Sequence, residues 1–136
     1  MDYGTLSKKA LRRALSDFPD ATITVVHVID FRSSDLGPGG FGSSETAWDD
    51  WLEEARGHAA ELLADAEEIA DEHGVDIVTD TVVGEDSRSI VDYADEHGFD
   101  LIVMGSHGRS LPARILLGSV SATVVRRASV PVMVVR

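Results

Sequence analysis

One stretch near the C-terminus constrains the fold of this chain more than any other. A short apolar run, 101–104, leads into the glycine-rich loop 105–108 (Gly-Ser-His-Gly); nine residues follow, and then Gly118 and Ser119 open a second apolar segment. In α/β proteins this order of strand, glycine-rich loop and helix start holds phosphate, because unpaired N–H groups and the helix dipole attract an anion there. The two loop glycines let the backbone approach a ligand closely. Ser119 is expected to cap the helix or to donate its hydroxyl to a phosphate.

Helical and strand-like patterns alternate along the whole chain. Apolar residues at helical spacing alternate with short runs rich in β-branched residues and bounded by turn signals. This alternation predicts one α/β domain over residues 1–136, a doubly wound parallel sheet with helices on both faces. Ligands of such sheets bind beyond the C-terminal ends of the strands. We expect helices at 5–18, 48–73, 87–97 and 119–128, and strands at 21–30, 77–83, 101–104 and 130–135.

Two segments leave alternatives open. Residues 31–46 contain several glycines and serines, and so long a loop is either a lid over a ligand or a disordered excursion. The apolar seam of 48–73 is typical of a helix packed on a sheet, with a coiled coil as the alternative.

A near-repeat marks two helix ends. The sequence Asp-Glu-His-Gly occurs at 71–74 and again at 95–98, each time before a predicted strand. The glycine suits a left-handed helix end, and a histidine cation suits the helix C-terminus. A pair of metal sites at His73 and His97 is the alternative interpretation.

The charge balance excludes some functions. The chain has 12 Lys and Arg against 24 Asp and Glu, a net charge of −12, and no cysteine. Without a basic stripe we expect no nucleic-acid partner. The acid excess indicates either a merely solubilising surface or adaptation to a high-salt cytoplasm, where salt screens the self-repulsion. No apolar run approaches the length of a membrane span and no signal peptide opens the chain, so we expect a cytoplasmic protein.

The spacing of the glycines resembles the Gly-x2-Gly-x9-Gly-Ser/Thr nucleotide motif of the universal stress protein family. The segment 101–136 is similar to the last strand, loop, helix and strand of that family, and 22–30 and 83–94 look like its second strand and its third strand with helix. The resemblance implies an ATP-binding stress-response domain with an adenine nucleotide α-hydrolase-like fold, usually a dimer.

The chain departs from the family pattern at its start. Residues 2–5 look like the Asp-Gly-Ser-like turn that follows the first family strand, but the strand itself is missing. In the family that strand lies mid-sheet, and unpaired buried backbone groups cost about 1–3 kcal/mol each. We therefore expect Met1 to be an internal methionine or a fragment boundary, unless the sheet closes up or another chain fills the gap.

The resemblance also assigns site residues. His107 could serve as a general base, but no carboxylate stands beside it in the sequence, so a binding role is favoured. Arg109 is our own addition, a counter-charge to phosphate or else a solvated arginine. The predicted nucleotide-binding residues are Asp2, Val28, Met104, Gly105, His107, Gly108, Arg109, Gly118, Ser119, Val120 and Ser121.

These observations predict a regulatory protein that binds ATP, with Mg²⁺ or Mn²⁺ as a possible companion ion. The lysine of a P-loop is absent, no dedicated metal site is evident, and nothing resembles a water-positioning residue with an arginine finger, so we expect slow or no hydrolysis. The last strand, 130–135, is expected to be a sheet edge covered in a homodimer. The alternatives are a dimeric interaction module that does not bind nucleotide, and an adenine-nucleotide hydrolase or ligase-like enzyme, for which we find no nucleophile.

Overall fold

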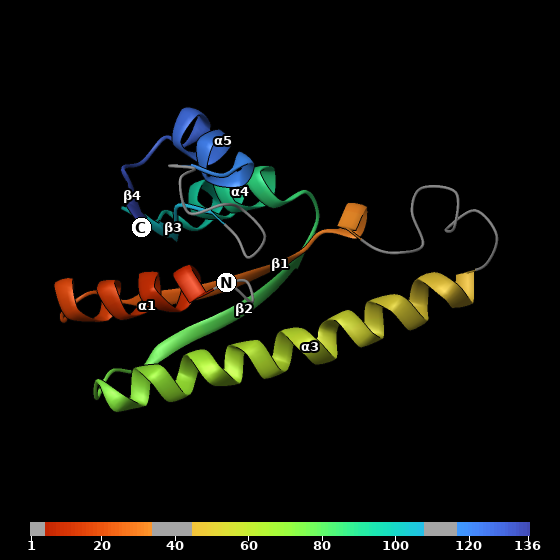
Figure 1. The fold of residues 1–136 in the computed structure, drawn as a ribbon, viewed down its shortest axis with the longest axis horizontal. Helices are drawn as coiled ribbons and strands as arrows, with labels where there is room; N and C mark the ends of the chain where they lie inside the picture. Colours follow the sequence, from red (N-terminus) through yellow and green to blue (C-terminus); the bar gives the residue numbers. More distant parts are fainter. Residues whose placement is uncertain (1–4, 34–44, 108–116) are drawn as a thin grey trace.

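The computed structural model describes residues 5–33, 45–107 and 117–136. Helices and parallel strands alternate in it, as the sequence pattern predicts (Figure 1). In chain order the elements are α1 (Thr5–Asp17), β1 (Ile23–Ile29), the 3-10 helix η1 (Phe31–Ser33), α3 (Glu45–Glu72), β2 (Ile77–Val83), α4 (Asp86–His97), β3 (Ile102–Gly105), α5 (Ser119–Arg127) and β4 (Val132–Val135).

The main difference from the expected elements concerns the predicted loop 31–46. Its first three residues form η1 and its last two begin α3, so the long helix starts before the seam that predicts it. The residues between Ser33 and Glu45 lie outside the described part of the chain. The two interpretations of this loop, a lid and a disordered excursion, both concern these residues and stay predictions.

The four strands pair in parallel but as two separate sheets. β1 pairs with β2 from Ile23 opposite Ile77 to Ile29 opposite Val83, and β3 pairs with β4 from Ile102 opposite Val132. In the described chain no strand joins β1 to β3, so the sheet has not closed up. Helix α1 packs against both sheets instead, and α3 covers β1 and β2.

The main core lies where α1 and α3 meet the first sheet. Leu11 and Leu15 of α1 belong to one buried cluster with Val25 of β1 and with the inward face of α3. The seam predicted for α3 is this inward face, because Ala59, Leu62, Ala66 and Ile69 are all buried. Packing on the sheet therefore accounts for the seam, and no coiled coil is needed.

The two histidine-glycine repeats end helices. Gly74 and Gly98 have φ of +67° and +68°, the left-handed conformation that glycine adopts without strain. The ring Nδ1 of His73 lies 2.9 Å from the carbonyl oxygen of Ile69, and His97 repeats the contact with Tyr93 at 2.9 Å. No group of three or more metal-binding side chains occurs in the part of the chain that the structure describes. The helix-end interpretation of the repeat is confirmed.

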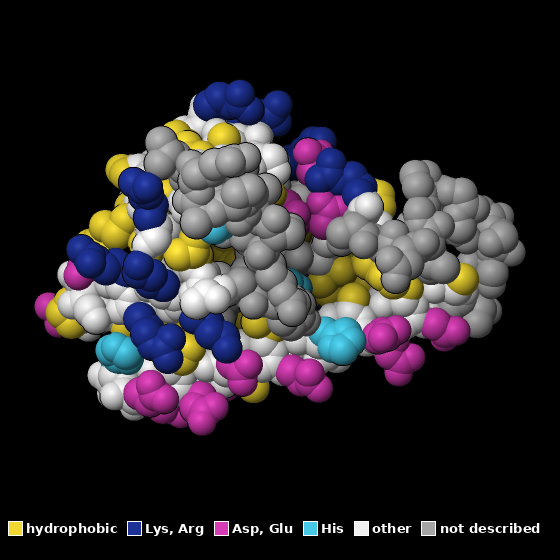
Figure 2. All heavy atoms as spheres, in the orientation of Figure 1, with side chains coloured by type: hydrophobic (Ala, Val, Ile, Leu, Met, Phe, Trp, Pro, Cys, Tyr) yellow, Lys and Arg dark blue, Asp and Glu magenta, His cyan; other side chains and the backbone are white. Residues whose placement is uncertain are grey.

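Charge is distributed unevenly over the surface. Figure 2 shows acidic side chains along α3 and basic side chains over α1, which carries Lys8, Lys9, Arg12 and Arg13. None of the described helices is both long and apolar enough to cross a membrane.

Candidate functional site at the C-terminal end of β3

The carbonyl oxygen of Ser106 organises the loop that follows β3. Ser106 is 2% exposed, and its N–H continues the β3–β4 ladder by donating to Val135 at 2.8 Å. Its carbonyl oxygen accepts the N–H of Gly118 at 2.6 Å and the hydroxyl of Ser121 at 2.5 Å. These bonds join the two ends of the glycine motif, although the segment between them lies outside the described residues.

Gly118, rather than Ser119, is the N-cap of α5. Gly118 is extended (φ −77°, ψ 173°), and its carbonyl oxygen accepts the first helical hydrogen bond from Ala122 at 2.9 Å. The prediction that Ser119 caps the helix is wrong, because the helix already begins at Ser119, and among the described residues no side-chain hydrogen bond caps its N-terminus. The N–H groups of the first turn point away from the helix body without intrahelical partners, which is the arrangement that attracts an anion.

The first turn of α1 reaches the same edge of the sheet. A Cβ atom built on Gly105 would lie 2.8 Å from Cβ of Leu6 and 3.3 Å from the carbonyl oxygen of Leu6. Gly105 therefore lets β3 and α1 approach closely, a packing role in addition to the predicted role at the ligand. The starts of α1 and α5 both lie near the end of β3.

A buried carboxylate at the end of β1 is the feature that the sequence reading missed. Asp30 is 8% exposed, and it accepts hydrogen bonds from the backbone N–H of Arg32 at 2.8 Å and of Asp86, at the start of α4, at 3.2 Å. The Arg32 guanidinium lies 2.7 Å from Oδ2 and also 3.7 Å from Glu85. An acidic residue directly after a β-branched strand is the signal in the sequence that could have revealed it. Asp30 thus fastens β1 to the start of α4 at the edge where the loop after β3 also lies.

Acid titration should expose the contribution of Asp30. The Arg32 side-chain hydrogen bond lowers the pKa of Asp30 below its usual value, and the two backbone N–H groups act in the same direction against burial. A lowered pKa means that the carboxylate stabilises the fold at pH above its unfolded pKa, about 3.9, and that this is lost as the pH falls through the folded value.

We expect Asp30→Asn to lower the free energy of unfolding by about 1–3 kcal/mol at pH 7. The difference in unfolding free energy from wild type should begin to narrow below about pH 4, where Asp30 of the unfolded chain takes up a proton, and narrow further as the pH falls through the lowered folded pKa. Urea unfolding of both proteins between pH 7 and pH 3 measures this. If the difference in unfolding free energy between the two proteins stayed constant from pH 7 to pH 3, the stabilising role assigned to the ionised Asp30 carboxylate would be contradicted.

The structure places only some of the predicted site residues together. Met104 and Gly105 end β3, His107 follows, and 118–121 begin α5, all around the Ser106 carbonyl. Val28 is partly buried in β1, one residue before the strand ends. The Ser121 hydroxyl bonds the Ser106 carbonyl, so it helps to shape the loop. Asp2, Gly108 and Arg109 lie outside the described residues.

Comparison with known proteins gives one family. The family model of the universal stress protein family matches residues 1–136. The universal stress protein MJ0531 of Methanocaldococcus jannaschii is 34% identical over 99% of this chain and 78% of its own length. The solved structure of MJ0577, from the same organism, has a TM-score of 0.84 at 27% identity, covering 99% of this chain and 90% of that one. A universal stress protein of Archaeoglobus fulgidus, solved in complex with dAMP, has a TM-score of 0.68 at 26% identity, covering 100% and 92%.

Proposed function

The chain belongs to the universal stress protein family, and we propose that it binds ATP, as a regulatory ligand, at the loop after β3 and the start of α5. The observation that carries the proposal is the first turn of α5, which no side chain in the described part of the chain caps, held beside β3 by the two hydrogen bonds to the Ser106 carbonyl. The complex of the Archaeoglobus fulgidus protein with dAMP supports an adenine nucleotide as the class of ligand.

Each part of the site has a distinct task in this proposal. The N–H groups of Ser119, Val120 and Ser121 receive the phosphates, since the first turn of a helix offers both donors and a positive dipole end. Gly105 and His107, with Gly108 and Arg109, border the phosphates and ribose. Val28 and Asp2 lie at the adenosine end. Mg²⁺ or Mn²⁺ bound with the phosphates would neutralise part of their charge.

Slow or absent hydrolysis is part of the proposal. Phosphoryl transfer needs a positioned water and a cation on the developing charge. Among the described residues, Arg32 after the end of β1 forms ion pairs with Asp30 and Glu85. Because these carboxylates already bind its guanidinium, we do not expect Arg32 to stabilise the charge of a transferring phosphoryl group. The nucleotide then acts as a signal or a stabiliser.

We also propose a homodimer that covers the outer edge of β4. Val132, Met133 and Val134 are only half-buried in the single chain, and β4 has a described partner strand on one side only. An apolar edge of this kind is usually covered, and a two-fold axis lets one edge cover another.

Calorimetric titration of ATP tests the nucleotide site. The protein is held in molar KCl with Mg²⁺, where the repulsion within an acidic surface is screened over about 3 Å. We expect dissociation constants in the micromolar range for ATP, weaker binding of GTP, and negligible release of phosphate over the titration. A folded protein that binds no adenine nucleotide would contradict the proposal and favour a dimeric interaction module.

A further inference from the structure

The outer edge of β2 offers unpaired backbone groups. In the described chain β2 pairs with β1 alone, so its other side is the edge of the sheet. The N–H of Gly84 donates to Ile29 of β1 at 3.0 Å. Since backbone groups alternate in direction along a strand, those of Thr79 and Thr81 point the opposite way, out of the sheet. Such an edge is a template for another strand.

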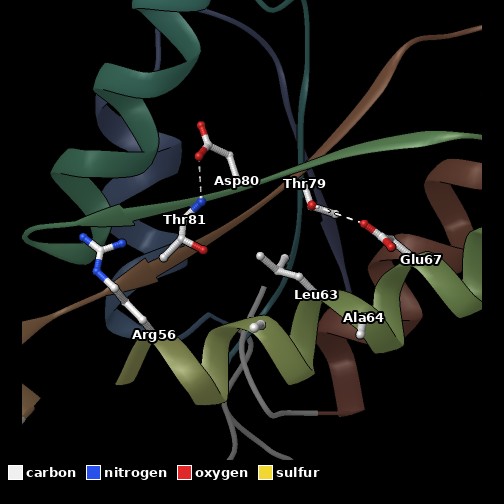
Figure 3. A pocket seen from close by; sticks show the side chains of 8 residues that line it. Arg56, Leu63, Ala64, Glu67, Thr79, Asp80 and Thr81 are labelled. Atoms are coloured by element: carbon white, nitrogen blue, oxygen red, sulfur yellow. Dashed lines mark hydrogen bonds between the residues drawn. The ribbon is translucent and has the colours of Figure 1, made fainter. Parts of the chain in front are cut away.

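A hollow lies directly beside this edge. It has a volume of about 480 Å³ and lies between β2 and α3, with Leu63 and the small side chains of Ala60 and Ala64 along the helix (Figure 3). Arg56 and Glu67 line it as well, and the Thr79 hydroxyl donates to Glu67 at 3.4 Å. A strand added to the edge would therefore have room for side chains on the α3 side.

The side chain of Asp80 forms a hydrogen bond with one of the outward-pointing backbone groups, the N–H of Thr81. Its Oδ1 accepts the N–H of Thr81 at 2.8 Å, and its Oδ2 accepts the hydroxyl of Tyr93 at 2.9 Å. Burial, followed by the hydrogen bond to Asp80, raises the pKa of Tyr93, so the phenol stays protonated and keeps donating. Thr81 N–H is thus already bonded, while no described group bonds the N–H of Thr79. An incoming strand would pair around Thr79.

The charge around the edge favours a cationic partner. Thr79 contacts α3, so the next side chain, Asp80, lies on the opposite face of the sheet and extends away from α3 (Figure 3). Arg56 is the only Lys or Arg in α3, whose other charged side chains are carboxylates apart from His58. Figure 2 shows these carboxylates gathered along the helix. Basic side chains on an added strand would face Asp80, and its apolar side chains would face Leu63.

We propose that the outer edge of β2 binds an extended, positively charged segment of another protein by strand addition. Main-chain hydrogen bonds at Thr79 supply the affinity, and the hollow over Leu63 together with the Asp80 carboxylate selects alternating apolar and basic side chains. This site is separate from the nucleotide site, and it does not depend on nucleotide being bound.

A fluorescent seven-residue peptide of alternating valine and lysine is the probe. Its binding to the full chain is followed by anisotropy, and amide hydrogen exchange of the chain is followed with and without it. A peptide of the same sequence with N-methyl groups on alternate amides has the same charge but cannot pair with the edge. We expect the unmodified peptide to bind at least tenfold more tightly, and the Thr79 amide to exchange at least tenfold more slowly in the complex.

Two variants separate pairing from charge. Thr79→Pro removes the outward N–H, which an edge strand tolerates, and it should lower the affinity at least tenfold. Asp80→Asn keeps an acceptor for Thr81 but removes the charge, and it should lower the affinity about threefold, whereas Asp92→Asn, an equal change on exposed α4, should not.

Equal binding of the two peptides would overturn the proposal, because only charge would then hold the peptide. The proposal would also be overturned if the peptide left the hydrogen exchange of the Thr79 amide in the wild-type chain unchanged. This measurement uses wild type only, so it is valid even if Thr79→Pro fails to fold. Concentration-dependent self-association that protects the Thr79 amide, without peptide binding, would identify the occupant as a second copy and would also overturn it.

Discussion

Gly105→Ala should destabilise the protein by about 1–3 kcal/mol, the usual cost of forcing an extra carbon into a packed site. The added Cβ would lie 2.8 Å from Cβ of Leu6 and 3.2 Å from the Leu6 carbonyl carbon. Two of the three nearest atoms belong to the α1 backbone, so relief requires the first turn of α1 to move away from β3. The conformation of Gly105 itself is not the cause, because its φ is not positive.

Gly57→Ala is the matched control for this effect. Gly57 is an exposed residue in α3, and a Cβ added to it would meet nothing within 4 Å. Alanine should stabilise the helix there by about 0.5–1 kcal/mol, since glycine is a poor residue in a helix interior. Urea unfolding of both variants measures the two changes in unfolding free energy, which should be a loss for Gly105→Ala and a gain for Gly57→Ala. A Gly105→Ala variant as stable as Gly57→Ala would refute the close packing of α1 on β3.

Local sequence patterns predicted most of the fold because each element carries its own signal. The strand at 77–83 matches β2 residue for residue, and the histidine-glycine repeats end α3 and α4 as expected. The ends of the other elements either match or differ by up to three residues, since helix and strand termini depend on tertiary contacts more than on pattern. Glu45, for example, begins α3 before the apolar seam does.

Tertiary contacts explain what the sequence could not predict at the site. The glycine spacing predicted that the loop after β3 and the start of α5 belong together, and the Ser106 carbonyl joins them in the structure. Nothing in the spacing indicated that Ser121 would donate to Ser106 or that Gly118 would be the N-cap. The hydrogen bond that the N–H of Asp86 donates to the Asp30 carboxylate joins residues far apart in the chain, and no local pattern in the sequence indicates such a pair.

Gly118→Val is expected to weaken ATP binding at least a hundredfold, about 2.8 kcal/mol at 1.4 kcal/mol for each factor of ten. The extended backbone of Gly118 (φ −77°, ψ 173°) is open to valine, and its N–H can keep its bond to Ser106. The branched side chain would then stand at the start of α5, where the proposed phosphates approach the N–H groups of the first turn. Calorimetry in molar KCl with Mg²⁺ measures the loss, and circular dichroism and urea unfolding check the fold.

Ser119→Glu keeps the test decisive if the buried position of Gly118 does not accept valine. Ser119 is exposed in the first turn of α5, where a carboxylate interacts favourably with the helix dipole and adds about 0.3–1 kcal/mol of stability. The same negative charge repels phosphate, so ATP binding should fall while the protein becomes no less stable. Gly57→Val, at an exposed position of α3 where an added Cβ meets nothing within 4 Å, should bind ATP as wild type does. Full ATP affinity in a folded Ser119→Glu protein would mean that the phosphates do not bind at the start of α5, whatever else the chain binds.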